Sequence, residues 1–236
     1  MTTHRDILMV AAERGLGLGL TRQFLQRGWN VLATALPGSD LGELEAAKNM
    51  GPGRLQIDHI DVTDFAQIES FRQGLASRTF DVIFLNAGIY GPLHQSVIQA
   101  TPEELQHIMM VNAFGPIRLA RSVLDRLKTP GTLAFMSSHR GSVAANIEGG
   151  LELYRASKAA LNILARGIYA DIREHGHTVL SLHPGWAATA MGTLNGTVEA
   201  EIDVETSVRG IAERVERHRH SGEHLYVDYE DRRWPW

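Results

Sequence analysis

The chain has 236 residues, a formal net charge of −4 and no cysteine. Its length and its hydrophobic content of 44% suit one sizeable core, so we expect one domain over residues 1–236. The lack of cysteine excludes disulfide scaffolds, thiolate metal sites and cysteine nucleophiles, and no block of basic residues favours nucleic acid as a partner. No segment approaches the roughly 18 apolar residues of a membrane helix, which predicts a cytoplasmic protein without a membrane partner.

Short apolar or β-branched runs alternate with longer amphipathic runs along the chain. In order, the pattern predicts a strand at 6–12, a helix at 18–27, a strand at 29–36, a helix at 40–49, a strand at 55–60, a helix at 64–77, a strand at 81–88, a helix at 101–128, a strand at 131–138, a helix at 154–175, a strand at 178–183, a helix at 205–218 and a strand at 224–227. Because parallel strands need crossover connections, this alternation favours an α/β fold: a Rossmann-type doubly wound parallel sheet of about seven strands with helices on both faces. The polar segment 191–204 is expected to form a substrate lid within that domain.

Such a sheet binds ligands at the carboxyl ends of its strands. After the first predicted strand, Gly15, Gly17 and Gly19 alternate in a tight turn into a helix, whose first N–H groups can hold a phosphate. A glycine-rich turn alone is also a common structural loop. Its interpretation therefore depends on the chemistry found elsewhere along the chain.

Tyr154 and Lys158 are four residues apart on a predicted helix, so their side chains lie on one face. A nearby ammonium favours the phenolate and lowers the pKa of a tyrosine from its usual value near 10, which makes the phenol a usable proton donor and acceptor. Ser138, at the end of the fifth predicted strand, could hydrogen-bond the same substrate oxygen. The alternative is an ordinary surface pair, which the scarcity of lysine in this chain disfavours.

With these residues in view, the chain resembles the short-chain dehydrogenase/reductase family over essentially its whole length. The resemblance lies in the glycine loop and in LNAG at 85–88, VNAFG at 111–115, SSHRG at 137–141, YRASK at 154–158 and HPGW at 183–186. The GLGLGL run, the Met-Gly pair at 191–192 and the final VDYEDRRWPW are most similar to the sniffer and C-factor branch, which is associated with carbonyl reduction.

The resemblance implies a catalytic set of four residues. Tyr154 would be the general acid/base, and Lys158 would lower the pKa of Tyr154 and bind the nicotinamide ribose. Ser138 would orient the substrate oxygen, with the neighbouring Ser137 as an alternative. Asn112 would hold a water that relays protons from Lys158 to solvent; alternatively, it only caps backbone groups in a kinked helix.

The resemblance also implies a dinucleotide site. Its residues would be Arg14, Gly15, Leu16, Gly17, Asp61, Val62, Asn86, Ala87, Gly88, Tyr154, Lys158, Pro184, Gly185 and Thr189. Asp61 could instead cap the following helix, and the segment 86–88 could be a plain turn. The end of the second predicted strand holds Ala35 and Leu36, so it carries neither the acid typical of NAD binding nor the arginine typical of NADP binding. Since Arg14 matches a family position associated with NADP, we expect NADP to be preferred, with NAD as the alternative.

Two residues depart from the family pattern in the glycine loop. Ala11 stands where the family has its first glycine, and an alanine with positive φ costs roughly 1 kcal/mol. Glu13 adds a negative charge where two phosphates should dock, unless it points to solvent or pairs with Arg14. The departures should weaken dinucleotide binding without abolishing it.

The sequence therefore predicts an NAD(P)-dependent oxidoreductase that transfers a hydride between a nicotinamide and a small-molecule carbonyl or alcohol. A pocket beside the motifs would be lined by Tyr90, His94, Trp186, Met191 and Leu194. The alternative is a catalytically silent dinucleotide-binding regulator of the same fold. Family analogy predicts a homodimer or homotetramer paired through the helices at 102–128 and 154–175. The spacing of the histidines does not suit a metal site.

Overall fold

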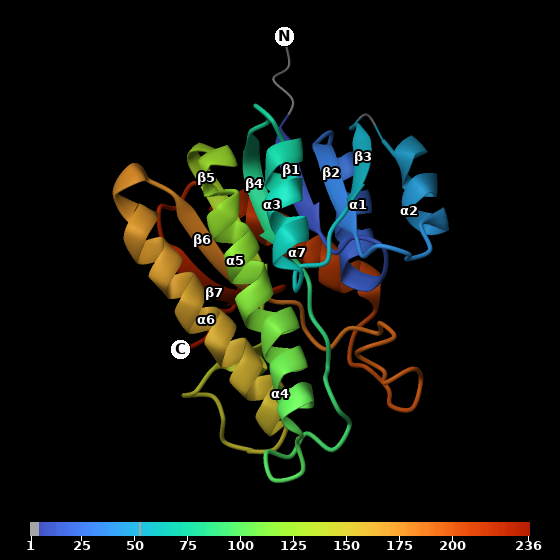
Figure 1. Cartoon of the computed structure of the whole chain (residues 1–236), viewed down its shortest axis with the longest axis vertical. Helices are drawn as coiled ribbons and strands as arrows, with labels where there is room; N and C mark the ends of the chain where they lie inside the picture. Colours follow the sequence, from blue (N-terminus) through green and yellow to red (C-terminus); the bar gives the residue numbers. More distant parts are fainter. Residues whose placement is uncertain (1–4, 52) are drawn as a thin grey trace.

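A parallel sheet runs through the centre of the molecule (Figure 1). The computed structural model describes residues 5–51 and 53–236. Within them, seven strands pair in the order β3-β2-β1-β4-β5-β6-β7, and every pairing is parallel. The strands are β1 (Asp6–Val10), β2 (Asn30–Ala35), β3 (Leu55–His59), β4 (Phe80–Leu85), β5 (Leu127–Met136), β6 (Thr178–His183) and β7 (His224–Asp228). The predicted fold class is confirmed.

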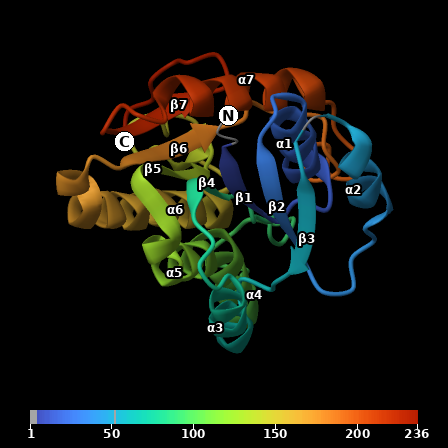
Figure 2. The ribbon, with the colours of Figure 1, turned by 90° about the horizontal axis from the view of Figure 1, so that it is seen from above.

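Helices cover both faces of this sheet (Figure 2). They are α1 (Gly15–Gln26), α2 (Gly42–Ala46), α3 (Phe65–Gly74), α4 (Pro102–Met109), α5 (Gly115–Ser122), α6 (Glu152–Ile172) and α7 (Val204–His218). Alternate strand residues face opposite layers: Ile7 and Met9 pack with α1 and α7, whereas Leu8 and Val10 pack with α3, α5 and α6. This alternation yields two separate cores, one on each face of the sheet. None of the helices in the described part of the chain is long and apolar enough to cross a membrane.

The predicted helix at 101–128 is divided in the structure. A capping box between Thr101 and Glu104 starts α4 as the sequence indicates. A π-helix at Met110–Phe114 then separates α4 from α5, and β5 already begins at Leu127. The helix thus continues through the π turn and ends at Ser122, so its predicted end at 128 was wrong. The wider π turn contains the buried Asn112, whose side chain is bonded to backbone outside the helix.

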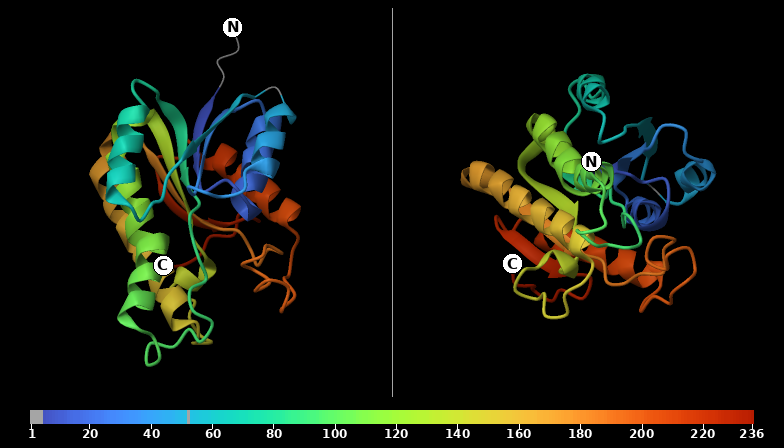
Figure 3. Two further views of the ribbon diagram at one scale, coloured as in Figure 1. Left: turned by 45° about the vertical axis from the view of Figure 1, so that its right-hand side comes forward. Right: turned by 60° about the horizontal axis from the view of Figure 1, so that its bottom comes forward.

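The order of the strands reverses between β1 and β4, which are neighbours although two strands separate them in sequence. In an open α/β sheet, this reversal opens a crevice at the carboxyl ends of the strands. The connections after β4, β5 and β6 extend beyond that end of the sheet (Figures 1 and 3). The predicted site residues lie at this end.

Candidate active site

The glycine loop after β1 has the backbone of a tight phosphate-type turn. Ala11 adopts φ +59° and Gly15 adopts φ +54°, both in the left-handed region. Ala11 thus has the positive φ that glycine tolerates better. Its methyl group packs against the core that contains Leu8 and Val10. At Gly17, an added Cβ would lie 2.0 Å from the carbonyl oxygen of Ala11, so only glycine fits. Asn86 holds the same carbonyl through its Nδ2, at 2.8 Å.

The N-terminus of α1 suits an anion. Arg14 is the N-cap residue, and no side-chain cap from the described residues occupies the first N–H groups. Arg14, Gly15 and Leu36 line a cavity of about 880 Å³. Glu13 lines it too, and its Oε2 is buried without a hydrogen-bond partner among the described residues. Glu13 as a whole is partly exposed, and no ion pair between Glu13 and Arg14 is present among the described residues.

Lys158 and Asn112 form the buried floor of the site. The Lys158 side chain comes from α6, and its Nζ donates to the carbonyl oxygen of Met136 at 2.9 Å. Burial lowers the pKa of Lys158 to about 8. A Cβ on Gly88 would lie 3.2 Å from this Nζ and 3.5 Å from Asn112 Oδ1, so a side chain at this position would crowd the lysine and the asparagine.

The side chain of Asn112 is engaged with the chain itself. Its Oδ1 accepts from the Ile89 N–H at 2.7 Å, and its Nδ2 donates to the Ile89 carbonyl and to Ser157 Oγ, both at 2.9 Å. These bonds hold the π-helix against the connection after β4. The water relay through Asn112 stays a prediction.

Tyr154 projects from the first turn of α6 towards Ser138. Burial raises the pKa of Tyr154 to about 12, and the hydrogen bond with the Ser138 side chain acts in the opposite direction. The predicted lowering of this pKa is wrong for this arrangement. Lys158 Nζ lies 5.8 Å from the Tyr154 ring centroid and is bonded to Met136, so the cost of burying a phenolate dominates.

The structure distinguishes the two adjacent serines. Ser137 Oγ donates to Asn162 Oδ1 at 2.7 Å inside the protein, whereas Ser138 is hydrogen-bonded to the Tyr154 side chain. Ser138 also begins the short 3-10 turn at His139–Gly141 by accepting from the Arg140 N–H. Ser138 is therefore the serine that lies beside Tyr154, whereas Ser137 is bonded to Asn162 inside the protein.

The remaining predicted cofactor residues surround the crevice. Thr189 stands beside the glycine loop, 3.6 Å from where a Cβ on Gly15 would lie. Pro184 and Gly185 follow β6, where Ser207 Oγ donates to the Pro184 carbonyl at 2.6 Å. Asp61 does not cap α3: it accepts from the Thr63 N–H and hydroxyl, and Asp64 caps the helix. That alternative for Asp61 is therefore wrong.

The predicted pocket residues divide into three groups. Tyr90 stacks on Tyr154, with ring centroids 5.9 Å apart. Trp186, Met191 and Leu194 belong to the connection between β6 and α7, where the Trp186 indole donates to the Gly192 carbonyl at 2.6 Å. His94 pairs with Glu104 at the start of α4 and accepts from the Ser96 N–H, so its contacts point it to the helix cap instead of to Tyr154.

Sequence reasoning missed Gln95, which is 4% exposed. Its Oε1 accepts from the Tyr154 N–H at 2.9 Å, and its Nε2 donates to the carbonyls of Tyr90 and Pro92, both at 2.8 Å. Gln95 thereby attaches the loop that carries Tyr90 to the first turn of α6. All three partners are backbone groups, which any residue carries, and Tyr154 is distant in sequence. No local sequence pattern could therefore have revealed Gln95.

The chain is similar in sequence to a known family and to known proteins. The family model described as "Enoyl-(Acyl carrier protein) reductase" matches residues 10–217. The C-signal of Myxococcus xanthus is 33% identical over 173 residues, which cover 72% of this chain and 100% of that protein.

Solved structures agree over nearly the full length. A short-chain dehydrogenase/reductase from Burkholderia multivorans with bound NADP has a TM-score of 0.93 at 32% identity and covers 99% of this chain and 100% of its own. A carbonyl reductase from Pseudomonas aeruginosa PAO1 in complex with NADP has a TM-score of 0.88 at 36% identity, with the same coverage of 99% and 100%.

Proposed function

The chain belongs to the short-chain dehydrogenase/reductase family, and from this premise we propose that it is an NADP(H)-preferring carbonyl reductase. The predicted family and its sniffer and C-factor branch are confirmed by these similarities. The observation that carries the proposal is the assembly of Tyr154, Ser138 and Lys158 at the crevice where the strand order reverses. The reaction would reduce an aldehyde or ketone, or oxidise the corresponding alcohol.

The chain offers a fitting cradle for the dinucleotide. The uncapped N-terminus of α1, with Gly15 on the cavity, would receive the pyrophosphate, and Gly17 lets the turn close against the Ala11 carbonyl. Arg14 lies on the cavity, and the end of β2 is followed by Leu36 instead of the acid typical of NAD binding, which favours NADP over NAD. Acids from elsewhere line the same cavity: Glu13, Asp40, Glu43 and Glu205. Both NADP-bound neighbours described above support this choice. When bound, the dinucleotide supplies the hydride.

The side chains would handle the proton. Ser138 donates a hydrogen bond to the carbonyl oxygen of the substrate and orients it beside the phenol of Tyr154. The raised pKa of about 12 keeps Tyr154 protonated at neutral pH, so it can give its proton to that oxygen as the alcohol forms. The Lys158 ammonium then stabilises the phenolate until the proton is replaced from solvent. The carbonyl, the hydride and the proton together give the alcohol.

Two further parts of the predicted site belong to this proposal. The turns between β6 and α7, over residues 191–204, would act as the lid, with Trp186 at their base. Tyr90, stacked on Tyr154, would face the substrate from the opposite connection. The chain would assemble as a homodimer or homotetramer through α4, α5 and α6.

A second function is favoured by one observation, the buried and unpartnered Oε2 of Glu13 in the phosphate loop. A carboxylate there opposes pyrophosphate binding, as would suit a regulator that has lost turnover. Fluorescence titration with NADPH and NADH, together with a turnover assay on the same sample, separates the two functions. Saturable binding with turnover favours the enzyme, saturable binding without turnover favours the dinucleotide-binding regulator, and no binding of either at millimolar concentration excludes both.

The decisive experiment replaces Tyr154 by Phe. We expect kcat for NADPH-dependent reduction of a panel of aldehydes and ketones to fall about 100-fold or more, because a general acid contributes at least this much. The dissociation constant for NADPH should stay within about twofold. Turnover is followed by the loss of the reduced nicotinamide absorbance.

Tyr169→Phe is the matched control, because Tyr169 lies on the same helix and its hydroxyl donates to the Gly222 carbonyl, away from the site. Its kcat should equal that of the wild type. Full turnover by Tyr154→Phe would exclude the proposed mechanism.

A further inference from the structure

The segment after β7 reaches the back of the active site. Trp234 packs against His139 and His183, with ring centroids 5.3 Å and 5.9 Å apart. His139 directly follows Ser138, and His183 directly precedes Pro184 at the end of β6. One indole therefore touches both connections that carry predicted substrate and cofactor contacts.

The two histidines are themselves joined. His139 Nδ1 and His183 Nε2 are 2.9 Å apart, so one ring donates to the other. Burial lowers the pKa of His139 to about 4 and that of His183 to about 3, which leaves both rings neutral at neutral pH. This bond ties the connection after β5 to the connection after β6.

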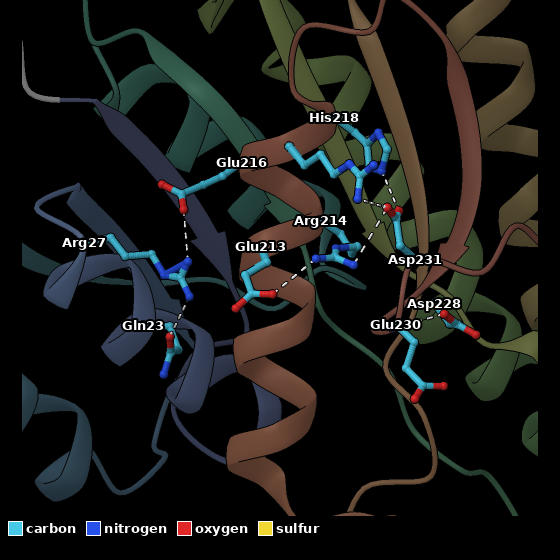
Figure 4. Close-up of polar contacts among 10 residues, drawn as sticks. Gln23, Arg27, Glu213, Arg214, Glu216, His218, Asp228, Glu230 and Asp231 are labelled. Atoms are coloured by element: carbon cyan, nitrogen blue, oxygen red, sulfur yellow. Dashed lines mark hydrogen bonds and ion pairs between the residues drawn. The ribbon is translucent and has the colours of Figure 1, made fainter.

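Trp234 is held in place by a buried carboxylate. Asp228, at the end of β7, accepts from the Trp234 indole N–H at 3.0 Å through Oδ2. Its Oδ1 accepts from the N–H groups of Glu230 and Arg232, at 3.0 Å and 2.8 Å. The turn formed in this way is anchored on its far side by Asp231, which pairs with His218 and Arg217 of α7, at 2.6 Å and 2.7 Å (Figure 4).

We propose that Trp234 is a positioning residue for the reaction: held by Asp228, it fixes the His139–His183 bond and with it the placement of Ser138 relative to the Pro184–Gly185 turn. The inference rests on the proposed function for its kinetic consequence. Two contacts of Tyr226 in β7 support the same role. Its hydroxyl donates to the Ser138 carbonyl, and its ring stacks on Trp236 of the same segment. No motif of the family's catalytic set includes this segment.

The test compares Trp234→Ala and Trp234→Phe with wild type. Loss of the indole in Trp234→Ala should lower kcat by about 10- to 100-fold, since misplacement of a reacting group by about 1 Å has an effect of this size. KM and the NADPH dissociation constant should stay within about twofold. Trp234→Phe keeps a ring against both histidines and should recover most of kcat, whereas a merely structural role would not separate kcat from KM.

Trp29→Phe is the matched control. The Trp29 indole also donates to a carboxylate, Glu216, at 3.2 Å, but Trp29 directly precedes β2 and so lies at the amino end of the sheet, away from the site. The kcat of Trp29→Phe should equal that of the wild type, even if the variant has a lower melting temperature than the wild type. Wild-type kcat in Trp234→Ala would overturn the inference.

A second readout does not depend on turnover. The imidazole N–H shared by His139 and His183 should give a slowly exchanging proton resonance in wild type, because Trp234 covers it, and exchange should broaden it in Trp234→Ala. An unchanged resonance would overturn the inference. Absence of turnover by the wild type would instead reject the proposed function, while the resonance still tests the role of Trp234.

Discussion

At the scale of single residues, the site depends on charges that the fold buries. Lys158 is only 3% exposed and has a carbonyl oxygen as partner, so the folded chain bears the cost of desolvating an ammonium. For Tyr154, burial is costly only when the phenol loses its proton, because the phenolate would then be desolvated. The resting site is thus a protonated phenol beside an ammonium whose pKa of about 8 lies close to neutrality.

The Lys158 shift predicts how stability depends on pH. Below about pH 8, Lys158 is charged in both the folded and unfolded chain; between about pH 8 and its usual value of 10.5, the unfolded chain binds the extra proton. Stability must therefore rise with pH across this window, by up to about 1.4 kcal/mol per pH unit. Urea unfolding of wild type and Lys158→Met should show the wild type gaining free energy of unfolding relative to the variant as the pH increases. A constant difference would contradict the assigned shift.

At the scale of elements, α6 begins without a local cap. Its N-cap residue, Leu151, has φ +49° and provides no side-chain bond, so the Tyr154 N–H in the first turn is satisfied by Gln95 from another loop. Gln95 itself has φ +53°, and its buried amide offsets the strain through three hydrogen bonds. The start of the catalytic helix and the loop of Tyr90 therefore form one unit.

Replacing Gln95 by Leu should break this unit. The change leaves the Tyr154 N–H and the carbonyls of Tyr90 and Pro92 without their partner, at about 1–3 kcal/mol for each buried group. We expect a loss of about 3 kcal/mol or more in the free energy of unfolding, measured by urea denaturation. Gln99→Leu, an exposed position in the same loop, should change stability by less than about 0.5 kcal/mol. Equal effects of the two substitutions would refute the role of Gln95.

Elements with strong local signals could be predicted from sequence, and contacts between distant segments could not. Periodicity and the Thr101–Glu104 capping box located α4, but nothing local indicated the π-helix that follows, because Asn112 makes its bonds to Ile89. The motif residues Tyr154 and Ser138 were found from spacing and resemblance. Gln95 was missed because all its partners are backbone atoms, and Trp234 because its partners come from other strands and loops.

At the scale of the whole molecule, the two helical layers differ in what they join. On one face, α7 is linked to α1 by the ion pair of Arg27 with Glu216 and to the segment after β7 through Asp231 (Figure 4). On the other face, α4 and α6 pack together, and Leu105 of α4, Phe114 of the π-helix and Ile163 of α6 are 43%, 48% and 69% exposed. The second face is the one through which family analogy predicts pairing.

Ile163→Glu should therefore dissociate the expected homo-oligomer. A carboxylate on this apolar face would be desolvated in a helix-to-helix interface, so sedimentation velocity should shift from an assembled species in wild type to a monomer in the variant. Ile98→Glu, an equally apolar position on a loop, is the control and should sediment like wild type. A monomeric wild type, or an assembled Ile163→Glu variant, would reject this interface.

The order of the sheet has a consequence for the synthesis of the chain. β1, β2 and β3 are made first, yet the inner edge of β1 has no neighbour until β4 at Phe80–Leu85 has left the ribosome. An unpaired strand edge is a template for pairing with another chain. The nascent chain is therefore most prone to aggregation while α3 and the start of β4 are being translated, and this is the stage at which a chaperone that covers strand edges would protect it.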